Sequence, residues 1–235
     1  MDRDTLAKAS LATYSMLGSK SKIERVENAD EVMDGTGFKV VDSLSGRDVL
    51  YLANDDTKQV IIAHRGTDIT GYKTAPDLKS DFLIAMGMEK QGEEFIKRKN
   101  KTKTLIKNIP DDYSVFLSGH SYGGSSINES LKGSKLVRDR VEGVATFNSG
   151  FSPFSKKGVG KTTASKLDDK VTHYRTDEDI VSSSIRINKP FGKIVEYKPK
   201  ISVMMEAGRK IPSALQPIFS GQHQINIHKI TNFMK

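Results

Sequence analysis

Apolar and polar residues alternate through the first third of the chain in a way that predicts one helix followed by strands. Between Thr5 and Leu17 apolar side chains return at every third or fourth position, which predicts an amphipathic helix. Short apolar runs bounded by turn residues follow, and they predict strands at 37–42, 48–53 and 59–63. The order predicts a β-meander that leads into a buried strand.

The rest of the pattern alternates between helices and strands. Apolar residues are sparse among the lysines from Gln91 to Ile109, which predicts one helix exposed on its outer face, or two shorter helices. A strand at Tyr113–Ser118 precedes a helix at Gly124–Leu131, and further strands are predicted at Val141–Phe147 and Lys170–Tyr174. Strands that alternate with helices predict a largely parallel sheet.

Length and composition limit the class of protein. A chain of 235 residues can bury one sizeable core, so we expect a single domain over residues 1–235. Hydrophobic residues make up 36% and charged residues 28%, which is typical of a soluble globular protein. No apolar run is long enough for a membrane span, and the acidic first residues do not resemble a secretory signal. The compartment stays open.

The net charge of +8 is concentrated in three segments, Lys90–Lys107, Lys156–Lys170 and Lys189–Lys210. Such segments favour an anionic partner, although a solvated basic surface explains them as well. They lack the interleaved aromatic residues of a single-strand binder, so nucleic acid is not expected. Peripheral contact with an anionic membrane surface fits better.

The pentapeptide Gly119-His-Ser-Tyr-Gly123 stands between a predicted strand and a predicted helix. This is the context of a nucleophile elbow, in which a serine occupies a strained turn and two glycines allow close backbone approach. The pattern alone should arise by chance in roughly one chain in seven of this composition, so the strand and helix around it carry the argument.

A serine nucleophile needs a histidine base and an acid that orients the histidine. In the chain order serine, acid, histidine, the segment after the strand at Lys170–Tyr174 offers Asp177 and Asp179, and the end of the chain offers His223 and His228. The chain has no cysteine, and its five histidines lack the spacing of a zinc protease. We therefore expect no cofactor and no metal.

Three separated motifs together resemble the class 3 lipases, the fungal-lipase branch of the α/β-hydrolases. They are the strand ending Val60-Ile-Ile-Ala-His-Arg-Gly-Thr67, the elbow Gly119–Gly124, and Asp179-Ile-Val181. The resemblance covers residues from about 37 to 233. It implies an α/β-hydrolase fold with a central, mostly parallel sheet and helices on both faces.

The resemblance also implies a role for each matching residue. Ser121 matches the nucleophile, Asp179 the acid and His228 the base, with Asp177 and His223 as alternatives. Thr67 and Tyr122 match the two residues whose backbone amides form the oxyanion hole. The implied activity is hydrolysis of lipid esters, acylglycerol or phospholipid, through an acyl-enzyme.

The resemblance implies that His120 packs and hydrogen-bonds beside the elbow. Arg65 is expected to anchor the oxyanion loop, and His64 and His173, which lie within strands, are expected to be core or surface fillers. The short polar segment Asp68–Leu83 does not predict a large hydrophobic lid. Three serines, Ser182-Ser-Ser184, follow the acid motif where the family often has proline.

Two other functions compete with this interpretation. Ser155-Lys-Lys-Gly-Val-Gly-Lys-Thr162 is similar to a phosphate-binding P-loop, but its first glycine is replaced by Ser155, so a basic surface loop is the better interpretation. The second alternative is a catalytically inactive hydrolase fold that binds lipid or acts as a scaffold. The chain has a nucleophile, an acid, a base and an oxyanion residue in suitable order. Their presence favours an active enzyme over an inactive binding or scaffold protein.

Overall fold

The structure is a computed structural model that describes residues 1–17, 21–66, 89–150, 161–176, 179, 191–198 and 230–234. The helices are α1 (Arg3–Ser15), α2 (Lys22–Val32), α4 (Glu89–Asn108), α5 (Tyr122–Gly133), α6 (Lys135–Arg140), α7 (Lys161–Asp168) and the short 3-10 helix η2 (Ile230–Phe233). The strands are β1 (Lys39–Val40), β2 (Val49–Asn54), β3 (Gln59–His64), β4 (Ser114–His120), β5 (Val141–Phe147), β6 (Val171–Thr176) and β7 (Lys193–Tyr197).

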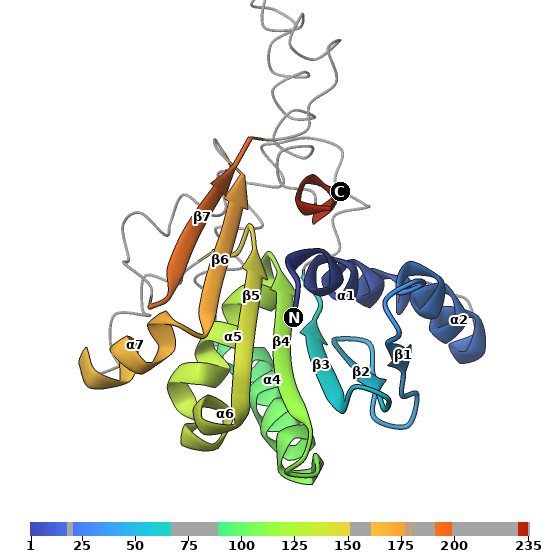
Figure 1. Ribbon diagram of the computed structural model, residues 1–235, viewed down its shortest axis with the longest axis horizontal. Helices are drawn as coiled ribbons and strands as arrows, with labels where there is room; N and C mark the ends of the chain where they lie inside the picture. The colour runs from blue at the N-terminus through green and yellow to red at the C-terminus, as the bar shows by residue number, and fades with distance from the viewer. Residues whose placement is uncertain are drawn as a thin grey trace, which may run out of the picture.

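All of these strands join one sheet in the order β1-β2-β3-β4-β5-β6-β7 (Figure 1). β1, β2 and β3 are antiparallel neighbours, whereas every pair from β3 to β7 is parallel. The predicted β-meander and the predicted parallel sheet are therefore confirmed. Parallel strands end at the same edge of a sheet, so the residues that follow β3, β4, β5 and β6 gather there.

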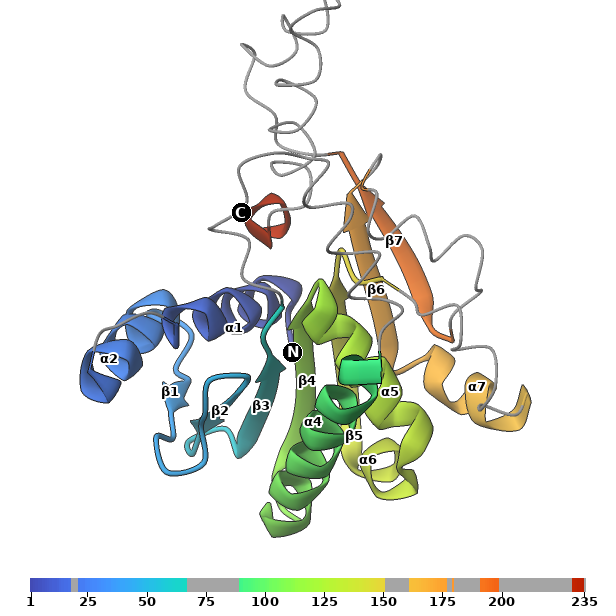
Figure 2. The same ribbon diagram turned by 180° about the vertical axis from the view of Figure 1, so that it is seen from behind.

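Two apolar layers cover the sheet because successive side chains of a strand point to opposite faces. In β2 and β3, Leu50, Leu52 and Ile61 pack toward α1, while Val49, Tyr51 and Ile62 pack toward α4 and α5. Figure 1 shows α1 in front of the sheet, and Figure 2 shows α4, α5 and α6 on the other face. The predicted fold class, α/β with helices on both faces, is confirmed.

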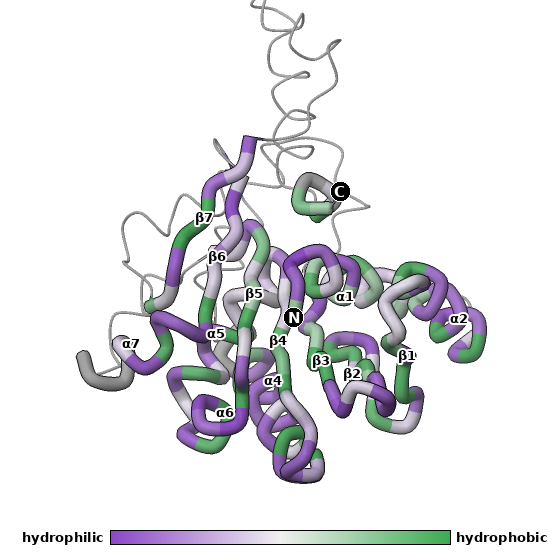
Figure 3. The backbone as a smooth tube through the Cα atoms, in the orientation of Figure 1, coloured by the Kyte–Doolittle hydropathy of each residue, from purple (hydrophilic) through white to green (hydrophobic). Residues whose placement is uncertain are grey.

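Figure 3 shows the middle of β3 and β4 in hydrophobic colours and α4 as largely hydrophilic. α4 buries Leu105 and Ile106 while most of its lysines face solvent. The sequence left open one helix or two shorter ones over this segment, and the structure has one. None of the helices in the described ranges has the length and apolar content that crossing a bilayer requires.

Small residues let α1 approach the sheet closely. Ala7, Ala9 and Ala12 are fully buried. The hydroxyls of Ser10 and Ser118 lie 2.6 Å apart, and Ser118 donates a hydrogen bond of 2.5 Å to the carbonyl of Leu6. A buried hydroxyl is costly without a partner, so these bonds fix the height of α1 over β4.

Two fully buried histidines connect the strands to their surroundings. Thr102 donates to the Arg98 carbonyl, so it accepts from Nε2 of His64 at 2.8 Å, and Nδ1 of His64 lies 3.1 Å from the Ser126 hydroxyl. In β6, Nε2 of His173 donates to the Phe191 carbonyl at 2.7 Å. Both histidines were expected to be core or surface fillers. They lie in the core, where each one also forms hydrogen bonds.

Several elements were not predicted. α2, α6 and α7 lie in polar segments to which the pattern assigned no element, and β7 lies in the proline-containing tail where the prediction ended. α2 has a capping box, since Ser21 accepts from the Glu24 amide and Glu24 accepts from the Ser21 amide. The capping box, together with the packing of Val26 and Ala29 against the core, accounts for this helix.

We expect the free energy of unfolding to fall as the pH decreases below about 6.5. Burial, and then the charge of Arg98, lowers the pKa of His64 from 6.5 to about 3, and burial lowers the pKa of His173 to about 4. Between these values and 6.5 the unfolded chain binds more protons, so acid favours it.

Urea denaturation of the wild type and of His64→Gln at about pH 7 and about pH 5 tests this expectation. Over that interval each histidine should lower the free energy of unfolding by about 2 kcal/mol. The decrease in the free energy of unfolding from about pH 7 to about pH 5 should therefore be about 2 kcal/mol smaller in the variant than in the wild type. An equal difference in the two proteins would contradict the prediction.

Candidate active site

Ser121 is the residue between β4 and α5, at the sheet edge where the parallel strands end. Its backbone has φ 54° and ψ −126°, a conformation that residues other than glycine rarely adopt. Its amide donates a hydrogen bond of 2.9 Å to the carbonyl of Phe147 in β5. Its carbonyl accepts hydrogen bonds from the amides of Gly124 and Ser125. The strained serine is thus held from both sides.

Glycines around Ser121 allow three backbone segments to meet. A methyl group on Gly123 would collide with the carbonyl oxygen of His64 and lie 2.9 Å from the carbonyl carbon of Arg65. A methyl group on Gly119 would lie 2.7 Å from the amide nitrogen of Gly124. Because the obstacles are backbone atoms, no side-chain rotation relieves them. Gly123 is therefore required by the close approach of α5 to the end of β3, and Gly119 by the close approach of β4 to the first turn of α5.

Gly66 and Tyr14 complete the surroundings of the serine turn. A methyl group on Gly66 would collide with the hydroxyl of Tyr14 and lie 3.2 Å from Cβ of Ser121. The Tyr14 hydroxyl lies 2.7 Å from Nδ1 of His120, and the two rings meet edge to face. His120 therefore has the packing and hydrogen-bonding environment that was expected, with Tyr14 of α1 as a partner that the sequence did not indicate.

The end of β3 is held by two arginines and one carboxylate. Arg65 donates to Asp48 at 2.6 Å, and Arg98 of α4 donates to the same oxygen at 3.2 Å. Arg98 also donates 2.5 Å to the carbonyl of Arg65, and Arg65 donates 2.9 Å to the carbonyl of Gly66. Arg98 is 5% exposed, so its bond to the Arg65 carbonyl lies where water screens little, whereas the Asp48 side chain is 39% exposed and its ion pairs are screened more.

Tyr122 follows the serine and points its ring toward α4. The ring centroid lies 4.8 Å from that of Phe95, and the Arg98 guanidinium lies 4.9 Å from it. Burial raises the pKa of the Tyr122 hydroxyl to about 12, so the hydroxyl stays protonated at neutral pH. The side chain thus anchors α5 to α4, while the proposed oxyanion role concerns only the Tyr122 amide.

Asp179 lies just beyond β6 and is 2% exposed. Its amide donates to the carbonyl of Thr176 at 3.3 Å, which turns the chain directly after the strand. Ser121 and Asp179 therefore follow β4 and β6, and one strand, β5, separates them.

Asn148 positions the start of this turn, and the sequence did not indicate it. It is fully buried and has φ 43°, in the left-handed region. Its side-chain oxygen accepts from the Thr176 amide at 2.8 Å, and its side-chain nitrogen donates to the Thr176 hydroxyl at 3.0 Å. Asn148 thereby joins the end of β5 to the last residue of β6, three positions before Asp179.

Other residues that the sequence indicated lie outside the described residues. They are Thr67, Asp177, His223, His228 and the stretch 151–160 that holds most of the P-loop-like segment. Within the part of the chain that the structure describes, no three histidine, aspartate or glutamate side chains gather as metal ligands would.

A mostly parallel sheet with helices on both faces, and a serine in a strained turn between a central strand and the following helix, define an α/β-hydrolase fold. The hydrolase fold expected from the motifs is therefore confirmed. The arrangement suits acyl transfer, because the turn places Ser121, which is 3% exposed, at the edge where the other candidate residues gather.

No family model and no curated protein matches the chain, but solved structures of lipases are similar to it. One is a triacylglycerol lipase whose catalytic centre is a serine protease triad, with a TM-score of 0.49 and 14% identity over 85% of this chain and 78% of that chain. The Rhizomucor miehei lipase in its propeptide complex has a TM-score of 0.41 and 15% identity over 78% of this chain and 64% of that chain.

A triacylglycerol lipase from Penicillium expansum has a TM-score of 0.39 and 16% identity, over 83% of this chain and 76% of that chain. These are the kind of protein that the sequence motifs resembled. The likeness is distant and carries no conclusion about what this chain acts on.

Gly123→Ala should destabilise the fold by about 3 kcal/mol or more, since the methyl group overlaps backbone of β3. Gly46→Ala is the matched control, because a methyl group there would meet no atom within 4 Å, and its effect should stay within about 0.5 kcal/mol. Thermal and urea denaturation measure both. Similar stabilities of the two variants would show that α5 can move away from β3.

Proposed function

We propose that this chain is a serine-dependent carboxylic ester hydrolase that acts on lipid esters through an acyl-enzyme intermediate. The observation that carries the proposal is Ser121, held in a strained backbone conformation between β4 and α5. Strain of this kind persists only where surrounding contacts enforce it, and it is typical of functional sites. The motif resemblance to lipases directs the proposal to lipid esters rather than to peptides.

The acid of the proposed triad is Asp179. Ser121 and Asp179 follow strands two positions apart in the sheet, so their backbones are separated by about 10 Å. One imidazole with a hydrogen bond on each side fits between side chains that lean toward each other across this gap. The bonds between Asn148 and Thr176 support Asp179 by fixing where its turn begins.

The base of the proposed triad is His228. It precedes Ile230 of η2 by two residues, which limits the distance between their Cα atoms to about 7 Å. η2 packs at the site edge, where the rings of Phe233 and Phe147 lie 5.2 Å apart between centroids. His223 stands seven residues before Ile230, so the packing of η2 constrains it much less. This difference favours His228.

The proposed oxyanion hole consists of the amides of Thr67 and Tyr122. Arg65 holds the carbonyl of Gly66, and because a peptide unit is planar and trans, this also sets the direction of the amide in the same unit. The Tyr122 amide belongs to the first turn of α5, where the helix dipole favours negative charge.

In the proposed reaction Ser121 Oγ attacks the ester carbonyl carbon and its proton passes to His228. The negative oxygen is stabilised by the two amides, and Asp179 stabilises the imidazolium. The carbon–oxygen bond to the alcohol then breaks, and His228 returns the proton to that alcohol. Water repeats the sequence on the acyl-serine, so a carboxylic acid leaves and Ser121 is regenerated.

The substrate class we propose is acylglycerol or phospholipid, met as single molecules or at an anionic membrane surface. Of the three basic segments, Lys189–Lys210 lies largely outside the described residues and Lys156–Lys170 lies partly outside them. In the third, Lys101, Lys103 and Lys107 are exposed on α4. Of these, Lys107 is in the last turn of α4 and lies toward the sheet edge opposite Ser121, whereas Lys101 and Lys103 flank Thr102, which is hydrogen-bonded to His64 at the end of β3.

Ser121→Ala should abolish labelling by a fluorophosphonate probe and lower ester turnover by about 10⁴-fold or more. Ser43→Ala is the matched control, because Ser43 is exposed in the turn before β2, and it should label like the wild type. Gel fluorescence and p-nitrophenyl ester assays measure both effects. A folded wild-type protein that does not label would favour the inactive, lipid-binding alternative.

Asp179→Asn and His228→Gln should each lower kcat by about 10³-fold or more, while Asp177→Asn and His223→Gln should stay within about tenfold of the wild type. The carboxylate and the imidazole act only in assisting Ser121, so melting temperatures should change far less than turnover. The four variants are compared on one soluble ester. If Asp177→Asn or His223→Gln has the larger effect, the assignment moves to that residue.

A further inference from the structure

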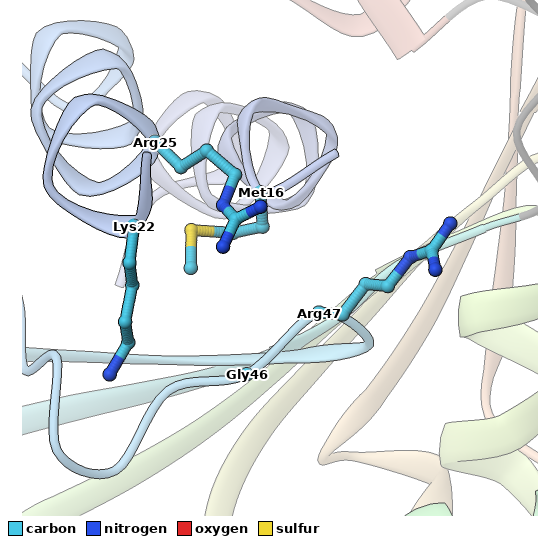
Figure 4. A pocket seen from close by; sticks show the side chains of 5 residues that line it. All are labelled: Met16, Lys22, Arg25, Gly46 and Arg47. Carbon is cyan, nitrogen blue, oxygen red and sulfur yellow. The ribbon is translucent and has the colours of Figure 1, made fainter. Parts of the chain in front are cut away.

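A cavity of about 300 Å³ lies between the end of α1, the beginning of α2 and the turn before β2 (Figure 4). Met16 forms a buried apolar wall, and Gly46 leaves the turn open because a methyl group there would meet no atom within 4 Å. Among the described residues, the rest of the lining is cationic and consists of Lys22, Arg25 and Arg47. Neither the proposed triad nor the oxyanion hole uses this cavity.

The charges around the cavity are only partly balanced. Lys22 pairs with Asp42 at 2.8 Å, but both side chains are about half exposed, so this pair contributes little and is exchanged readily. Within the described residues the guanidinium of Arg47 has neither a hydrogen-bond nor an ion-pair partner. Figure 4 shows it directed away from Arg25, and rotation about its side-chain bonds can turn it toward the cavity without breaking an interaction.

The residue types around the cavity match a phosphate group. A guanidinium presents a planar fork of donors that binds phosphate oxygens in pairs, and an ammonium adds a compact charge. The cations come from α2 and from the turn before β2, so they can approach an anion from two sides. A volume of about 300 Å³ lies in the range of small-molecule sites, which leaves room for the group that carries the phosphate.

The cavity lies near the sheet edge that holds Ser121. Val49 of β2 pairs with His64 of β3, and His64 pairs with Gly119 of β4, so the start of β2 and the serine turn are about two strand spacings, or about 10 Å, apart. The carbonyl of Arg47 also accepts 3.0 Å from Nε of Arg65, which precedes Gly66. The exposed lysines of α4, in contrast, lie on the other face of the sheet.

We propose that this cavity binds a phosphate group, supplied by the head group of a phospholipid or by a soluble phosphate compound. In a glycerophospholipid the phosphate and the acyl esters stand on one glycerol, so binding at the cavity brings an ester toward the serine turn. In this form the inference rests on the proposed ester hydrolysis and narrows its substrate to phosphate-bearing lipids. Binding of phosphate itself does not depend on that activity.

The first measurement is calorimetric titration of the full chain with inorganic phosphate and with glycerol 3-phosphate. The double variant Arg25→Gln/Arg47→Gln is compared with Lys101→Gln/Lys103→Gln, which removes the same charge from the exposed face of α4. We expect binding to the wild type and to the α4 variant, and at least tenfold weaker binding to the cavity variant. Equal weakening in both variants would overturn the site, because it would reflect net charge alone.

The second measurement compares kcat/KM for a short-chain phosphatidic acid and for the diacylglycerol with the same acyl chains. The ratio of the two values should fall at least tenfold in the cavity variant and stay unchanged in the α4 variant. Phosphate binding without a change in this ratio would support a soluble phosphate compound as the ligand. An unchanged ratio together with no phosphate binding would overturn the proposal.

Failure of the proposed ester hydrolysis and failure of the proposed phosphate site give different results. A wild-type protein that hydrolyses neither ester contradicts the hydrolase, while the titration still decides whether the cavity binds phosphate. Circular dichroism melting curves of both double variants check that each one folds. Because Lys22 and Arg47 are exposed, Lys22→Gln/Arg47→Gln serves as a second cavity variant if the loss of Arg25 unfolds the protein, with the same expected results.

Discussion

The close approach of α5 to the end of β3 is the constraint on which the site depends. Gly123 leaves no space for a methyl group against the His64 carbonyl, and Gly66 leaves none against Tyr14. These contacts hold the turn between β4 and α5 in a conformation that a serine would not adopt alone. The strain at Ser121 is thus maintained by three elements, β3, α1 and α5.

Buried polar groups give this contact its rigidity. His64, Thr102 and Ser126 form hydrogen bonds that connect β3 to α4 and α5, and Arg98 connects α4 to the Arg65 carbonyl. Each of these groups would be costly to bury without its partners, so the network favours one relative position of the elements. The same burial that lowers the pKa of His64 keeps it a neutral hydrogen-bonding group near neutral pH.

The sequence predicted those parts of the fold whose cause is local. The short apolar runs of β2 and β3 and the glycines of the elbow express constraints within a few residues, so the sheet and the serine turn could be expected. α2 and α7 are largely polar, so the packing of a few apolar residues decides both helices, and a capping box adds to it in α2. Asn148 could not be expected, because its left-handed backbone makes sense only with Thr176, which stands 28 residues away. The cavity at Met16 likewise joins side chains from separate elements.

The residues Arg47 and Asp48 connect the cavity to the serine turn through one short segment. The carbonyl of Arg47 and the carboxylate of Asp48 both accept from Arg65, whose guanidinium also holds the Gly66 carbonyl. The side chain of Arg47 belongs instead to the cavity wall. An anion that draws this side chain inward acts on a segment already hydrogen-bonded to the strand end beside Ser121. Recognition of a phosphate and alignment of the proposed oxyanion amides would then share one structural support.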